Sequence, residues 1–156
     1  PMLMEDGRVR PIYSAEAVKW QFGEMAKISS QGEFTANLVR TVTGRPVGWY
    51  VYYSNPGNVS RVFALEGLER YLPGIVDDLF DDADSRGAGA LIGRVEPRLR
   101  SALLQRGVFV HGGGSLQMVH SKDASLMDSA QLGRVAINRL QGENWYWWAI
   151  VAATVA

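Results

Sequence analysis

The chain has 156 residues, which suits one compact domain, and its 47% hydrophobic and 21% charged residues are typical of a folded globular protein. Sixteen basic and sixteen acidic residues give a net charge of zero, which argues against a protein that coats nucleic acid. The sequence contains no cysteine and only two histidines, so disulfides, zinc–thiolate sites and a cysteine nucleophile are excluded, no metal centre is expected, and a cytoplasmic location is indicated.

The first half of the chain predicts a helix followed by an antiparallel meander. A short strand is expected at 7–13, and Ser14 is a suitable N-cap for a helix that runs to about Lys27. Three strands rich in aromatic and β-branched residues follow, at 34–42, 47–53 and 59–65, and turn sequences separate them. Strands joined by such short turns are expected to pair antiparallel.

In the second half of the chain, helices alternate with short strands. Pro73 suits the first turn of a helix that Gly87 can close. The elements expected after it are a buried strand at 88–93, a helix at 97–107, a glycine-centred hairpin at 108–120, helical pieces at 124–138 and a strand from Trp145. The twelve-residue apolar run from Trp145 to Ala156 is too short for the ~20 residues that span a bilayer. The order of elements predicts an α+β fold, with a mixed, mostly antiparallel sheet flanked by helices.

Four segments stand out in order along the chain. They are 48–53 (GWYVYY), 93–99 (GRVEPRL), 116–123 (LQMVHSKD) and 139–148 (RLQGENWYWW). With the order of elements they resemble the GNAT superfamily of N-acetyltransferases, and most closely the C-terminal half of proteins with two GNAT-like halves. The resemblance covers nearly all of 1–156, as a single domain, and the start at Pro1 suggests a piece of a longer protein.

The resemblance implies a sheet that splays in its middle. In the family, acyl-CoA inserts its pantetheine arm between the strands that correspond to 59–65 and 88–93, and amides at the start of the following helix hold its pyrophosphate. This places a cofactor site at Leu65, Arg70 and Gly74. Two features depart from the family pattern. Pro73 and Ile75 interrupt the glycine-rich phosphate motif, and Leu103 stands where the family often has a tyrosine general acid.

Several charged groups are candidates for chemistry at this site. Glu66 and Glu69 stand where the family often places a general base, and the alternative is a pair of solvated loop carboxylates. Five arginines form either a cationic rim for phosphate or ordinary surface charge: Arg70, Arg94, Arg98, Arg100 and Arg106. His111 and His120 are expected to be about 13 Å apart along the hairpin, too far to share a ligand.

The helix after Pro73 carries five aspartates. They are Asp77, Asp78, Asp81, Asp82 and Asp84. Like charges four residues apart are mildly destabilising, so either a basic partner or a cation compensates them, or they form a solvated face. The spacing is not that of a calcium-binding loop.

Three functions are compatible with these observations. The first is a catalytically degenerate domain of an acyltransferase-related protein, which requires no cofactor. It would pack through its aromatic strands against a second GNAT-like half or a homodimer partner and complete a cleft. The second is an active acyl-CoA-dependent N-acyltransferase with a divergent site for acetyl-CoA or another acyl-CoA and a small-molecule amine as acceptor. The third is a module that binds another small molecule in the splay.

Overall fold

The computed structural model describes residues 12–110, 120–132, 134, 135 and 140. Most of the predicted strand at 7–13, the hairpin turn with His111 and the strand from Trp145 lie outside the described residues. The described ends of the predicted hairpin, 108–110 and His120, form no strand, so the strand prediction is wrong at those positions.

Four strands form one sheet, in the order β1-β2-β3-β4. The first three are the predicted antiparallel meander: β1 (Glu33–Arg40), β2 (Pro46–Ser54) and β3 (Val59–Gly67). The short strand β4 (Ala90–Ile92) pairs with β3 in parallel. The crossover that makes this pair parallel is a helix, α2, as the sequence predicts.

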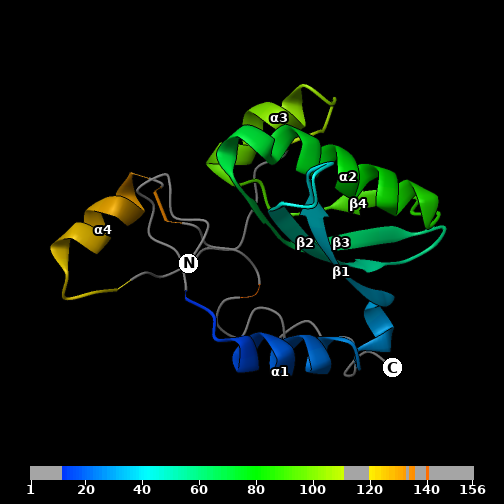
Figure 1. Cartoon of the computed structure of the whole chain (residues 1–156), viewed down its shortest axis with the longest axis horizontal. Coiled ribbons are helices and arrows are strands. Elements are labelled where there is room, and N and C mark those ends of the chain that lie inside the picture. The colour runs from blue at the N-terminus through cyan, green and yellow to red at the C-terminus, as the bar shows by residue number, and fades with distance from the viewer. Residues whose placement is uncertain (1–11, 111–119, 133, 136–139, 141–156) are drawn as a thin grey trace.

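The helices cover both faces of this sheet (Figure 1). On one face lie α2 (Leu72–Ser85) and the short α3 (Arg100–Leu104), and on the other lies α1 (Ala15–Met25). The Ser14 hydroxyl accepts a hydrogen bond from the Ala17 amide at 3.1 Å and so caps α1, as predicted. Gly87, at φ +74°, follows the end of α2 in the left-handed conformation that favours glycine.

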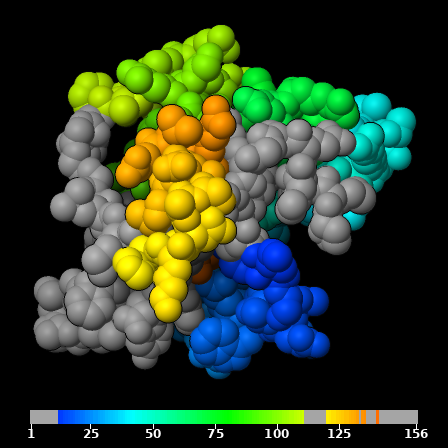
Figure 2. Space-filling view, turned by 90° about the vertical axis from the view of Figure 1, so that its left-hand side faces the viewer, coloured from blue at the N-terminus to red at the C-terminus, as the bar shows by residue number. Residues whose placement is uncertain are grey.

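Three short 3-10 turns complete this part of the fold. They are η1 (Ser29–Gln31), η2 (Glu69–Tyr71) and η3 (Pro97–Leu99). The predicted helix at 97–107 is therefore η3 followed directly by α3. A last helix, α4 (Ala124–Gln131), is shorter than the predicted 124–138. In Figure 2, α4 lies in the middle of the face turned to the viewer, between α3 above and α1 below.

Two hydrophobic clusters hold the sheet between the helices. On the α2 side, Tyr50, Tyr52 and Leu65 pack with apolar side chains of α2 and α3. On the α1 side, Val51 and Tyr53 pack with Met25, Phe63, Ala64 and Leu140. Alternate residues of β2 thus point into opposite clusters. Both faces of β2 are covered by elements of this chain itself.

Within the part of the chain that the structure describes, no helix combines the length and the apolar character needed to cross a bilayer.

Candidate functional site

The sheet opens between β3 and β4. The two strands pair only from Val59 with Ala90 to Arg61 with Ile92, whereas β3 continues to Gly67 paired with β2 but not with β4. A cavity of about 100 Å³ lies where the strands part, and its walls include Leu65 of β3, Leu79 of α2, and Glu96, Leu99 and Leu103. We call this region the splay. It lies between β3 and β4, which correspond to the expected strands 59–65 and 88–93 between which the resemblance implied it.

The guanidinium of Arg98 spans one side of the splay. Its Nη2 donates to the Leu65 carbonyl oxygen at 3.1 Å and to Glu66 Oε2 at 2.6 Å, and its Nε donates to Glu96 Oε2 at 2.9 Å. Only 1% of the Arg98 side chain is exposed. Its Nη1 is buried and forms no hydrogen bond among the described residues. The two carboxylates and one guanidinium form a buried cluster.

The electrostatics of this cluster follow from its burial. Burial raises the pKa of Glu96, and Arg98 only partly offsets this effect. For Arg98, burial lowers the pKa, but the charges of Glu66 and Glu96 outweigh burial and hold the pKa above its usual value. Arg98 therefore remains a cation at any physiological pH.

The structure changes the interpretation of Glu66. It is buried and paired with Arg98, so the solvated alternative is wrong for Glu66, whereas Glu69 is exposed on η2. Sequence reasoning missed Glu96, which precedes Pro97 and pairs with Arg98 two residues later. An acidic residue beside the Pro97-Arg98 pair was the available signal, but it does not indicate burial.

The three predicted cofactor residues have different environments. Leu65 is buried in the splay, and its carbonyl already accepts from Arg98. Arg70 is exposed, with its guanidinium carbon 5.0 Å from the ring centroid of Tyr71, and Gly74 is exposed in the first turn of α2. The Leu72 amide donates to Glu69, and Pro73 has no N–H. The start of α2 therefore offers fewer amides to a phosphate than an ordinary helix N-terminus.

The predicted cationic rim is wrong for two of its five arginines. Arg98 is buried in the splay cluster, and Arg106 binds Asp77 and the Pro73 carbonyl of α2 through Nη2, at 2.6 and 2.9 Å. The hydrogen bond from Arg106 lowers the pKa of the Asp77 carboxyl. Arg106 thus joins α3 to α2. The remaining three, Arg70, Arg94 and Arg100, are exposed.

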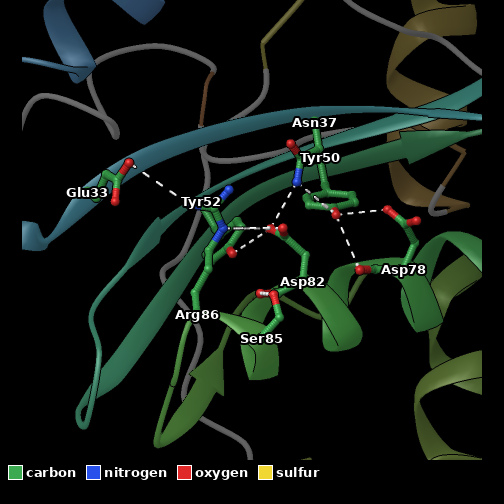
Figure 3. A network of polar contacts seen from close by, with 8 residues as sticks. All are labelled: Glu33, Asn37, Tyr50, Tyr52, Asp78, Asp82, Ser85 and Arg86. Carbon is green, nitrogen blue, oxygen red and sulfur yellow. Dashed lines mark hydrogen bonds and ion pairs between the residues drawn. The ribbon is translucent and has the colours of Figure 1, made fainter.

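The acidic face of α2 is compensated by the sheet (Figure 3). Asp82 Oδ2 accepts from the Tyr52 hydroxyl at 2.6 Å and from Asn37 Nδ2 at 2.9 Å, and Asp78 accepts from the Tyr50 hydroxyl at 2.8 Å. Arg86 adds a cation one turn after Asp82. The solvated-face alternative is therefore wrong for the half-buried Asp82, whereas Asp78 bonds Tyr50 and is still exposed to solvent. No group of acidic and histidine side chains that could hold a metal occurs among the described residues.

Comparison with solved structures identifies the architecture. An acetyltransferase from Trypanosoma brucei is 16% identical at a TM-score of 0.50, and the match covers 70% of this chain and 82% of that one. Glucosamine-6-phosphate N-acetyltransferase from Arabidopsis thaliana is 14% identical at a TM-score of 0.47, over 78% of this chain and 87% of that one. No protein-family model and no curated protein matches the sequence. The likeness is one of fold: the chain has the GNAT-like α+β architecture that the sequence predicts.

Proposed function

We propose that this chain is a GNAT-like domain of an acyltransferase-related protein that carries out no acyl transfer itself. Its role is to pack against a second GNAT-like half or a second copy and to complete a cleft there. One observation carries the proposal. Arg98 occupies both the Leu65 carbonyl and the Glu66 carboxylate, the groups that a cofactor and an amine would use.

The energies favour the state in which Arg98 stays bound to Leu65 and Glu66 over one in which a cofactor displaces it. Removing one partner of a buried ion pair costs about 3–5 kcal/mol, whereas a typical hydrogen bond gained in its place contributes only about 0.5–1.5 kcal/mol. A pantetheine arm that displaced Arg98 from Leu65 would have to recover this difference elsewhere. The cavity of about 100 Å³ is also well below the ~300–1,000 Å³ of ordinary small-molecule sites.

The groups that would perform the chemistry are also unsuited to it. Leu103 lines the splay cavity and has no proton to give a departing thiolate. Glu66, the candidate base, is already paired with the Arg98 guanidinium at 2.6 Å and is not free to approach an amine. Catalysis would therefore need groups from another part of a larger assembly.

Exposed apolar side chains support the packing role. Trp20 is 61% exposed and Leu38 is 52% exposed, although both are large and apolar. Such side chains, when they gather, mark surfaces that another protein covers. The partner we propose is a GNAT-like half or a copy of this chain.

The test is a calorimetric titration of acetyl-CoA into the purified chain, with CoA as a comparison. We expect no heat of binding with either ligand up to millimolar concentration. Micromolar binding of acetyl-CoA would overturn the proposal and favour the alternative, an active acyl-CoA-dependent N-acyltransferase. Arg70→Ala would then show whether Arg70 holds the cofactor, and amine acceptors would be searched.

A further inference from the structure

A second cavity lies away from the splay. It has a volume of about 410 Å³ and lies between α1 and the β1–β2 hairpin. Its walls comprise Tyr13, Val18, Gln21, Phe22, Ala36, Asn37, Leu38, Trp49, Tyr50, Val51 and Leu140. We call it the α1 cavity. Its volume, unlike that of the splay, falls within the range of ordinary small-molecule sites.

The walls of the α1 cavity are mostly apolar and aromatic. Phe22 and Trp49 contribute large rings, and Val18, Val51 and Leu140 contribute aliphatic surface. Among the described residues that line it there is no aspartate, glutamate, lysine, arginine or histidine. A phosphate, carboxylate or ammonium group placed against these walls would lose its hydration without gaining a counter-charge. The described walls therefore favour neutral molecules.

Gln21 and Tyr13 are polar residues of the walls, and the amino group of Gln21 is already engaged. Gln21 Nε2 donates to the Leu140 carbonyl at 2.7 Å. The Asn37 side chain instead lies on the α2 face of the sheet, where Nδ2 donates to Asp82 and to the Tyr50 hydroxyl, both at 2.9 Å. Figure 3 shows the Asn37 nitrogen directed at these partners.

The bond to Leu140 fixes the orientation of the Gln21 amide. What this amide has left is its carbonyl oxygen, which is an acceptor. A ligand that satisfies this oxygen must therefore bring an N–H or O–H donor of its own. An apolar ring with such a donor matches both features of the walls.

We propose that the α1 cavity binds a neutral, ring-containing small molecule that carries at least one hydrogen-bond donor. The ring packs against Phe22 and Trp49, and the donor bonds to the amide oxygen of Gln21. This site is separate from the splay, so its occupancy does not depend on acyl-CoA.

Three matched probes test the proposal by calorimetry on the whole chain. Indole is neutral and has one N–H donor, N-methylindole has nearly the same shape without the donor, and indole-3-acetate adds a charge. We expect millimolar or tighter binding of indole. N-methylindole should bind about 2- to 10-fold more weakly, the equivalent of one hydrogen bond, and indole-3-acetate more weakly still.

Two variants locate the binding. Ala36 lines the cavity and is exposed, so Ala36→Phe should fill part of the cavity without disturbing a buried core position, and should abolish indole binding. Ala90→Phe makes the same change at an exposed strand position outside the cavity and should leave binding unchanged. Circular dichroism confirms that both variants are folded.

Three outcomes would overturn the proposal. They are the absence of indole binding at millimolar concentration, equal binding of all three probes, and unchanged binding in a folded Ala36→Phe variant. The first would show that the cavity takes no ligand of this class. Equal binding of the three probes would show that neither the donor nor the charge of the ligand affects binding. Unchanged binding in the Ala36→Phe variant would show that indole binds elsewhere.

Discussion

At the scale of the residue, Arg98 determines what remains available in the splay. Its guanidinium donates to one carbonyl and to two buried carboxylates. Charged groups are rarely buried unless they are paired. Arg98 is therefore a structural residue in this chain.

We expect Arg98→Met to lower the free energy of unfolding by about 3–5 kcal/mol, because the buried carboxylates of Glu66 and Glu96 would both lose their ion pair with Arg98. Urea unfolding at neutral pH measures this change. The matched control is Arg94→Met, an exposed arginine of the same segment, which should change stability by less than about 0.5 kcal/mol. Equal effects of the two substitutions would show that the splay cluster contributes little.

Glu96 should make the stability of the protein depend on pH. Its pKa is raised by burial in the folded state, so the folded protein binds this proton more tightly than the unfolded chain does. The stability that this group contributes is present below its unfolded pKa and is lost as the pH rises through its folded pKa. Unfolding of wild type and Glu96→Gln, followed from about pH 4 to about pH 7, tests this.

The wild type should lose stability relative to Glu96→Gln as the pH rises over this range, because only the wild type must then bury the additional charge. Glu16→Gln, at an exposed position in the first turn of α1, is the control and should run parallel to the wild type. A pH profile of Glu96→Gln parallel to that of the wild type would contradict the raised pKa.

At the scale of the element, α2 is held to the sheet by two kinds of contact. Its apolar side packs on β2 and β3, and its aspartates accept hydrogen bonds from tyrosines of β2. The packing is close because β2 and β3 both present a glycine to Ile75 of α2. A methyl group on Gly67 would lie 2.2 Å from Ile75 Cδ1, and one on Gly48 would lie 2.3 Å from it.

Gly67→Ala should therefore destabilise the fold by about 1–3 kcal/mol, since the buried Ile75 cannot move aside freely. Thermal or urea unfolding measures the loss. Adding Ile75→Val removes the clashing methyl group and should recover part of it. Gly74→Ala is the control: a methyl group there meets nothing within 4 Å, and alanine in a helix is favoured by about 0.5–1 kcal/mol over glycine. Destabilisation by Gly74→Ala equal to that by Gly67→Ala would contradict this account.

At the scale of the whole molecule, the parts of the fold that were predictable are those encoded locally. The aromatic run at 47–53 predicts β2, and Pro73 and Gly87 bracket α2, because strand propensity and helix ends depend on neighbouring residues. The splay cluster was not predictable in this way. Arg98 and Glu66 are 32 positions apart, and nothing near either residue distinguishes a buried arginine from an exposed one. The α1 cavity likewise combines side chains from α1, β1 and β2.

The described part of the molecule should not be uniformly stable. β2 has side chains in both hydrophobic clusters, and α2 buries five residues: Leu72, Ile75, Val76, Leu79 and Ala83. By contrast, α1 buries only Gln21 and Met25 and exposes Trp20. Local opening requires less free energy where fewer apolar contacts are broken.

Native-state hydrogen exchange should therefore show the amides of β2 and α2 protected to nearly the global free energy of unfolding, and those of α1 protected less. Because α1 forms one wall of the α1 cavity, its opening would also control access to that site. Saturating indole should raise protection in α1 more than in α2, since a ligand that binds only the closed form stabilises that form. Equal protection of α1 and α2 in the free protein would contradict the difference in burial from which this prediction is drawn.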